Sequence, residues 1–317
     1  MGRYVLRRLG FLLLTLALTS ILVFGVMQLV PGDVARIVLG REASPDAVAE
    51  LRRELGLTEP LPVQYAQWLG NFVTGDWGQA YTFPQQPDIR PLVMEKLGDS
   101  LRLAVLVLLL ALPLSIAVGV WAGLNENRWP DNAVSIGSLA AVGLPEFVTG
   151  LILIEIFSYA FGWLPGSATG AADLPFVEAL PQLILPALTA TLVLLAYIAR
   201  LVRAGVIEEL KKPYVRTAAL KGLATRVVLA KHVLRNALLP TITVIAISFG
   251  WLIGGLIVIE VVFNYRGLGL LLLTAIDRRD LLLVQAITMV IVTGVALANL
   301  AADLLYAYLN PRIRLND

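Results

Sequence analysis

The sequence predicts an all-α integral membrane protein with six transmembrane helices and both termini in the cytoplasm. Of its 317 residues, 58% are hydrophobic and only 15% are charged, whereas a soluble domain carries about 25% charged residues. Six apolar runs each exceed the roughly 20 residues needed to cross the hydrocarbon core. Because a segment in the bilayer must satisfy its own backbone hydrogen bonds, these runs are expected to be helices.

The first apolar run spans residues 9–30 and follows Arg3, Arg7 and Arg8. A cleaved signal peptide is the alternative interpretation. The run is longer than the apolar core of a signal peptide, and it does not end in a small-x-small cleavage site. We therefore expect a retained anchor, so that residues 1–30 form a cytoplasmic tail and the first transmembrane helix.

The other five apolar runs define the rest of the organisation, at residues 101–124, 134–162, 182–203, 238–262 and 283–309. They predict an external loop region at 31–99, a core of five helices at 100–309 and a cytoplasmic tail at 310–317. The external region has a helix signal of its own, because Ser44 suits an N-cap, Pro45 the first helical position and Gly56 the stop.

The distribution of Lys and Arg orients the chain. With the N-terminus inside, 15 of the 25 basic residues lie in cytoplasmic segments, and nine of these fall between Arg200 and Arg235. Seven of the remaining ten lie in or just after the external region, and long translocated segments largely escape the positive-inside rule. The prediction is N-in and C-in.

The basic cytoplasmic loop at 204–237 predicts a short helix that needs a partner. Pro213 suits the first helical position and Gly222 suits C′. A helix of barely two turns is too short to be stable alone in water. A basic amphipathic helix follows, with apolar and basic side chains interleaved between Arg226 and Leu238. The alternative is a loop that lies on anionic lipid headgroups.

Several kinds of chemistry lack the residues they need. The chain has no Cys and one His, His232, which leaves little room for a metal centre or a His-based triad. A membrane-embedded hydrolase would need a His beside a Ser within the bilayer, and His232 is predicted in a cytoplasmic loop. There is no Gly-Lys pair, so the chain has no Walker loop for ATP. Nothing indicates a nucleic acid partner.

Ionisable residues inside predicted spans are candidate pathway residues. Glu155 lies within the apolar stretch 151–157, and lining a translocation path, bonding to another helix and protonation in place all remain open. Glu260 and Asp303 lie near span ends, where packing roles are favoured. Asn299 and Asp303 share a helix face and are expected to bond to a neighbouring helix.

Motifs in the cytoplasmic loop resemble those of a known transporter family. Thr217-Ala218-x-x-x-Gly222, followed by His232-x-x-Arg235-Asn236-Ala237-x-x-Pro240, is similar to the EAA loop of binding-protein-dependent ABC importer permeases. Tyr214-Val215 before it makes the loop resemble the dipeptide/oligopeptide permease family, in particular the first (B-type) of its two paired permease subunits. Short matches in order extend from Pro31-Gly32-Asp33 to Pro311-Arg312.

The chain departs from this family pattern at several positions. The family usually has Ser at positions 80 and 143, Arg-Ala at 219–220, Pro at 266 and Asp at 310. Here these positions hold Ala80, Gly143, Ala219-Leu220, Arg266 and Asn310. Ala80 and Arg266 fall in predicted external segments, so they bear on the cargo and on the binding protein, and the class of transporter stays the same.

The resemblance implies a type I ABC importer permease fold in the bacterial inner membrane and a non-catalytic role for this chain. It implies that a coupling helix contacts the ATPase through Tyr214, Val215, Thr217, Ala218, Gly222 and Leu223. We expect His232, Arg235 and Asn236 to support that loop, with a plain structural role as the alternative.

The implied partners are a second homologous permease, two ABC ATPase subunits that bind ATP and Mg²⁺, an external substrate-binding protein and membrane lipid. We expect no cofactor in this chain. Di- or oligopeptides are the expected cargo, with nickel, glutathione, opines or oligosaccharides as alternatives. An ion-coupled secondary transporter, which would work without ATPase subunits, is a more distant alternative.

Overall fold

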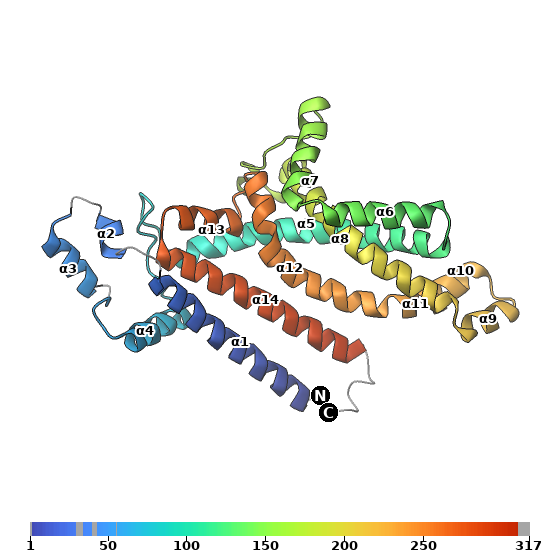
Figure 1. Ribbon diagram of the computed structural model, residues 1–317, viewed down its shortest axis with the longest axis horizontal. Coiled ribbons are helices and arrows are strands. Elements are labelled where there is room, and N and C mark those ends of the chain that lie inside the picture. The colour runs from blue at the N-terminus through green and yellow to red at the C-terminus, as the bar shows by residue number, and fades with distance from the viewer. Residues whose placement is uncertain (1, 30–33, 40–42, 55, 310–317) are drawn as a thin grey trace.

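The computed structural model describes residues 2–29, 34–39, 43–54 and 56–309, and this part of the chain forms helices with no strand. The predicted tail at 310–317 and Pro31-Gly32-Asp33 lie outside the described residues. Six helical segments follow the six predicted apolar runs (Figure 1). They are α1 (Gly2–Leu29), α5 (Ile89–Leu124), the pair α6 (Trp129–Gly143) and α7 (Glu146–Leu153), α8 (Phe176–Leu210), α12 (Leu239–Val262) and α14 (Leu281–Leu309).

Short helices join these segments. The external region holds α2 (Val34–Leu39), α3 (Pro45–Glu54) and α4 (Leu61–Thr74), and a π-helical turn η1 (Ile154–Ala160) continues α7. The remaining short elements are η2 (Ala171–Asp173), α9 (Pro213–Leu220), α10 (Thr225–Val227), η3 (Val228–Val233), α11 (Leu234–Ala237) and α13 (Leu268–Asp277). The predicted external helix is confirmed, because Ser44 Oγ accepts the Ala47 N–H at 3.2 Å and Gly56 has φ +66°.

The third apolar run, expected to form one helix, is divided into two helical segments by a sharp bend. Helix α6 and the segment from Glu146 to Ala160 meet at 106°. The bend lies at Leu144-Pro145, where Leu144 is extended (φ −89°, ψ 131°). A proline ring disfavours helical geometry in the preceding residue and removes a backbone N–H, so the helix ends there.

Four helices of the described residues are long and apolar enough to cross a membrane, namely α1, α5, α8 and α14, and the bent pair is a fifth candidate. Helix α12, with 24 residues and a strongly apolar sequence, coincides with the remaining predicted run. Several helices extend beyond their apolar runs. Helix α5 begins at Ile89, twelve residues before its run, because an apolar run marks only the part of a helix that suits hydrocarbon.

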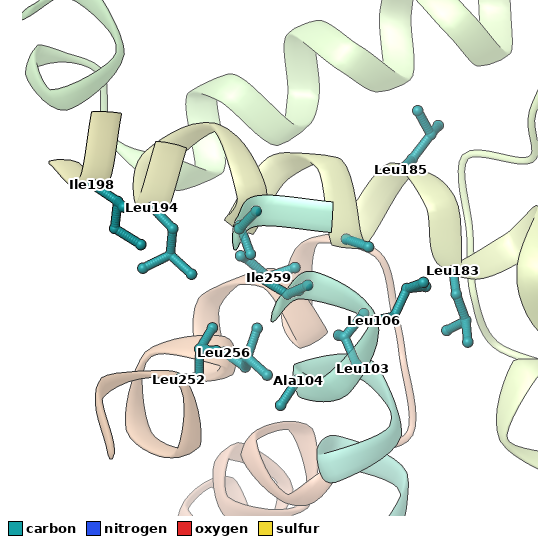
Figure 2. Close-up of a cluster of buried hydrophobic side chains, with 14 of the residues drawn as sticks. Leu103, Ala104, Leu106, Leu183, Leu185, Leu194, Ile198, Leu252, Leu256 and Ile259 are labelled. Atoms are coloured by element: carbon teal, nitrogen blue, oxygen red, sulfur yellow. The ribbon is translucent and has the colours of Figure 1, made fainter. Parts of the chain in front are cut away.

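The main core lies where α5, α8 and α12 meet. Figure 2 shows buried side chains from all three helices pointing toward one another, among them Leu103, Ile198 and Leu256, which are at most 2% exposed. Helices α5 and α8 approach closely because small residues line their contact. A Cβ on Gly119 would lie 2.6 Å from the Ala199 carbonyl oxygen, so only glycine fits there.

Helices α1 and α14 lie side by side, with the start of one beside the end of the other. Arg8 Nη1 and the Asp303 carboxylate are 2.7 Å apart, which confirms that Asp303 bonds to a neighbouring helix. In Figure 1 helices α9 and α10 lie toward one end of the long axis, and α2, α3 and α4 lie toward the other. Helices α9 and α10 belong to the predicted cytoplasmic loop and α2, α3 and α4 to the predicted external region, so these two regions lie far apart in the structure.

Candidate functional site

Helix α9 is a two-turn helix with a defined start and stop. Lys212 is its N-cap and Pro213 its first residue, as predicted. At its C-terminus the Gly222 N–H donates to the Ala219 carbonyl at 3.0 Å, and the Leu223 N–H donates to the Ala218 carbonyl at 3.3 Å. This bond pattern is a Schellman motif, which requires a left-handed residue at C′. Gly222 supplies it with φ +77°.

The two faces of α9 have different surroundings. Ala218, which is 8% exposed, and the half-buried Val215 pack into the chain's own apolar core beside Val228 and Val233. On the outward face Leu220 is 80% exposed and Leu223 is 42% exposed. Together they form a small exposed apolar surface at the end of α9.

The Tyr214 hydroxyl joins the start of α9 to the segment that follows it. The Asn236 carboxamide donates to this oxygen at 3.0 Å. The hydroxyl in turn donates to the Glu209 carboxylate, and the His232 carbonyl lies 3.3 Å away. Burial, and next the bond to Glu209, raise the pKa of the Tyr214 phenol above its ordinary value, so the hydroxyl stays protonated.

The three residues predicted to support the loop differ in their contacts. Asn236 reaches α9 with its side chain, whereas His232 does so through its backbone carbonyl. The side chain of Arg235 is exposed. Thr217, predicted as a contact residue, is exposed, and its hydroxyl donates to the Pro213 carbonyl at 3.1 Å.

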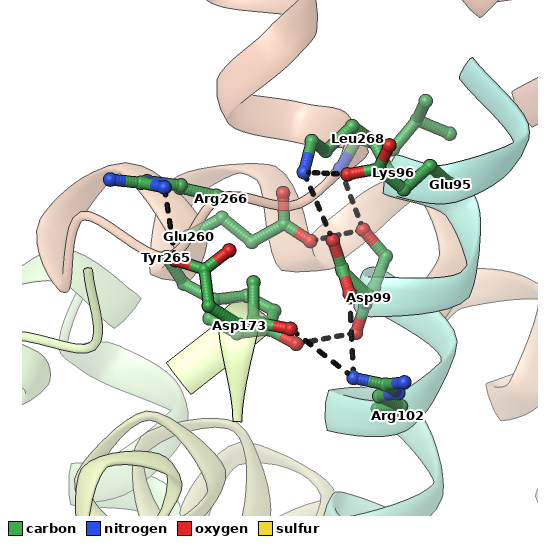
Figure 3. A network of polar contacts seen from close by, with 11 residues as sticks. Glu95, Lys96, Asp99, Arg102, Asp173, Glu260, Tyr265, Arg266 and Leu268 are labelled. Atoms are coloured by element: carbon green, nitrogen blue, oxygen red, sulfur yellow. Dashed lines mark hydrogen bonds and ion pairs between the residues drawn. The ribbon is translucent and has the colours of Figure 1, made fainter. Parts of the chain in front are cut away.

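A second polar cluster lies away from α9, around the start of α13. Glu260, which is 1% exposed, accepts the Gly269 N–H at 2.7 Å and the Leu270 N–H at 3.2 Å. Ser100 donates to the other oxygen of Glu260 and accepts the Leu268 N–H. Figure 3 shows Glu260 and Leu268 together with Asp99 and Tyr265. The cluster fixes α13 against α5 and α12, which agrees with the predicted packing role of Glu260.

The remaining predicted residues lie elsewhere in the fold. Glu155 is exposed, in the π-helical turn η1 beyond the bend. Arg266, a departure from the family pattern, forms an exposed ion pair with Asp173 at 3.1 Å. Ala80, another departure, is fully buried, so it cannot touch a binding protein directly. Within the described residues, no group of three or more His, Asp or Glu side chains could hold a metal ion.

Sequence reasoning missed two features of the cytoplasmic end. Leu220 is the most exposed large apolar side chain of α9. Its position within a basic, polar stretch could have indicated that it is exposed. The ion pair between the buried Asp131 and the partly buried Arg203 was also missed. These residues are 72 positions apart, and no local pattern in the sequence links them.

Two family models match the chain. The model of the "Binding-protein-dependent transport system inner membrane component" matches residues 115–315. A second model, which describes the N-terminal part of such a membrane component, matches residues 1–89. Together they cover residues 31–89 of the external region, the bent pair and the whole loop around α9.

Curated relatives match over nearly their whole length. A probable peptide ABC transporter permease protein of Sinorhizobium fredii is 37% identical over 314 residues, which is 99% of this chain and 100% of the relative. The glutathione transport system permease protein GsiC of Escherichia coli K12 is 36% identical, with 99% of each chain covered. The GsiC protein of Salmonella typhimurium shows the same identity and coverage.

Proposed function

Because this chain belongs to the family of binding-protein-dependent transport system inner membrane components, we propose that it forms half of the translocation pathway of an ATP-driven peptide importer. The chain is an ABC importer permease of the peptide/oligopeptide family and a multi-pass inner-membrane protein. The observation that carries the finer proposal is the exposed apolar face of α9 at the cytoplasmic end of the molecule.

In this proposal α9 is the helix that couples the membrane subunit to an ATPase. The outward residues Thr217, Leu220 and Leu223 touch the ATPase, while the inward residues Val215 and Ala218 seat α9 on the chain's own core. Tyr214 and Gly222 set the start and the end of the helix. Its eight residues are too few for stability on their own, so its packing at 210–238 keeps it folded before a partner arrives.

In this proposal, separate subunits bind and hydrolyse ATP. The chain has no Gly-Lys pair and therefore no Walker sequence, so we assign ATP and Mg²⁺ to two partner ATPase subunits and no catalysis to this chain. A second, homologous permease supplies the other half of the pathway. ATP binding draws the two coupling helices together and hydrolysis releases them, which shifts the membrane subunits between two conformations.

The cargo is a small peptide. One relative is named as a probable peptide permease and others as glutathione permeases, and glutathione is itself a modified tripeptide. Both names therefore favour a short peptide over nickel, opines or oligosaccharides. An external binding protein delivers the cargo, and helices α2, α3 and α4 form part of the surface on which it docks.

Glu155 is assigned to the translocation path. It is exposed in a π-helical turn, and such turns often occur at functional positions. The bend at Pro145 carries this turn away from the axis of α6. In the complete importer the turn would face the second permease across the pathway.

Uptake by proteoliposomes tests the proposal. The chain is reconstituted with its second permease, the two ATPase subunits and the binding protein, and uptake of a labelled tripeptide, glutathione and nickel is compared. We expect uptake of tripeptide or glutathione that requires both ATP inside and loaded binding protein outside. Uptake driven by an ion gradient without ATPase subunits would overturn the importer assignment, and uptake of nickel alone would overturn the cargo.

A further inference from the structure

An ion pair between the buried Asp131 and the partly buried Arg203 joins α6 to α8 near α9. Arg203 of α8 donates to both oxygens of Asp131 at the start of α6, and its Nη2 is 2.7 Å from Oδ2. Asp131 is 2% exposed. The carboxylate also accepts the Asn127 N–H at 2.8 Å. The carboxylate therefore accepts hydrogen bonds from the guanidinium and from the turn that precedes α6. The two-point contact with the guanidinium fixes the orientation of both side chains, which a lysine, with a single contact, would not do.

The same part of α8 is pressed against α5. A Cβ on Gly119 would lie 2.6 Å from the Ala199 carbonyl oxygen, and a Cβ on Gly123 would lie 2.9 Å from Val206 Cβ. At these positions α5 contributes no side chain, and the α8 backbone and its Val202 and Val206 side chains lie directly against the α5 backbone. The two helices therefore cannot slide past each other without separating.

The loop that carries α9 is held to α8 in the same way. A Cβ on Gly205 would lie 2.6 Å from the Ala237 carbonyl oxygen of α11. Ala237 itself is 2% exposed. The end of the loop therefore rests directly on the α8 backbone, two residues beyond Arg203.

We propose that Asp131 and Arg203 are positioning residues that make α6 move as one body with α8 and α9. This inference rests on the proposed coupling role of α9. A displacement of α9 moves α11 and α8 through their backbone contact, and the ion pair passes that displacement to α6. Helix α6 leads to the bend at Leu144-Pro145 and on to α7, so a movement of the ATPase also displaces the outer half of the pathway. In the other direction, the displacement caused by a binding protein on the outer face is transmitted to the ATPase through the same pair.

The pair suits this task because its carboxylate is buried, with the side chain of Asp131 2% exposed and that of Arg203 28% exposed. Solvent and salt weaken exposed ion pairs, whereas a buried pair keeps its geometry, and losing one partner leaves an uncompensated charge. The nearby pair of Lys211 and Glu126 provides the contrast. It also links the end of α8 to the turn before α6, at 2.9 Å, but its side chains are 65% and 39% exposed.

The test measures ATP hydrolysis by the reconstituted importer with and without loaded binding protein. For Asp131→Asn we expect hydrolysis without binding protein to continue, because α9 still contacts the ATPase, while stimulation by binding protein falls about tenfold. The matched control Glu126→Gln removes the exposed pair, and its stimulation should stay within about twofold of the wild type. Stimulation of Asp131→Asn at the wild-type level would overturn the inference.

A covalent replacement covers the case in which Asp131→Asn does not fold. The chain has no native Cys, so the double variant Asp131→Cys with Arg203→Cys can be cross-linked specifically, with cysteine-free partner subunits. A short bifunctional thiol reagent should restore stimulation, and a monofunctional reagent should not. An assembled, cross-linked importer that stays unstimulated would overturn the inference. If the wild-type importer itself shows no stimulation, the proposed function fails and not the role of this pair alone.

Discussion

Gly222 decides where α9 ends, and its role can be separated from packing. Its φ is +77°, a left-handed conformation that costs other L-residues about 1–2 kcal/mol. A Cβ at this position would meet no atom within 4 Å. A substitution there therefore changes the backbone preference and leaves the contacts within the chain unchanged.

Gly222→Ala should destabilise the end of α9 by about 1 kcal/mol, whereas Gly222→Asn should cost less because Asn tolerates the left-handed region. The measurement is the amount of ATPase subunit that co-purifies with each variant. We expect the order wild type, Asn, Ala. If Asn binds less ATPase than Ala, the left-handed conformation is not what matters at this position.

Glu260 is the corresponding residue at the outer end, where it holds the start of α13. Glu260→Ala would leave the Gly269 and Leu270 N–H groups and the Ser100 hydroxyl without their acceptor in a buried site. We expect a loss of about 2–4 kcal/mol, read as a lower thermal unfolding midpoint in detergent. Glu178→Ala, at an exposed position of α8, is the control and should leave the midpoint unchanged.

Local residue signals were readable from the sequence, and long-range pairs were not. Ser44, Pro213 and Gly222 act on their own helix, so the residue type and its neighbours predicted each role. Arg203 lies 72 positions from Asp131, and Ser100 lies 160 positions from Glu260. Composition and periodicity carry no information on such pairs, which depend on how the helices pack.

At the scale of helices, the fold depends on glycines that let α5 and α8 touch. A Cβ on Gly119 would come within 2.7 Å of Val202 Cβ as well as within 2.6 Å of the Ala199 carbonyl oxygen. Neither atom can move without its helix. The apolar runs predicted the helices, but they could not show which of their glycines face another backbone.

Gly119→Ala should therefore push α5 and α8 apart at a cost of about 1–3 kcal/mol. The matched substitution Gly137→Ala lies in α6, where a Cβ meets nothing within 4 Å, and it should be neutral or slightly stabilising. Thermal unfolding in detergent compares the two variants. Equal midpoints would mean that α5 and α8 are not in close contact.

The bend between α6 and α7 shows the limit of reasoning from apolar runs. The run at 134–162 is long enough for a span, and its composition alone predicts one helix. Pro145 was the signal that the helix ends at the preceding residue. The direction of α7 after the break is set by its packing against α8 and α12, which cannot be read from the apolar run.

For the whole molecule, the account requires α3 and α4 on one side of the membrane and α9 and α10 on the other. The chain has no native Cys, so single cysteines report on each side. Thr58→Cys, between α3 and α4, should react with a membrane-impermeant maleimide in right-side-out vesicles. Thr225→Cys, at the start of α10, should react only after the membrane is permeabilised. The opposite pattern would invert the topology and place α9 out of reach of ATP.

The central claim is that α9 transmits ATP hydrolysis to this subunit through its exposed face. The most direct measurement is ATP hydrolysis by the reconstituted importer, with and without loaded binding protein, for the wild type, Leu220→Asp and Gly222→Pro. The account predicts stimulation of the wild type, and variants that bind the ATPase poorly or are no longer stimulated. Variants that assemble and are stimulated as well as the wild type would contradict it, and would leave α9 as a basic loop at the membrane surface.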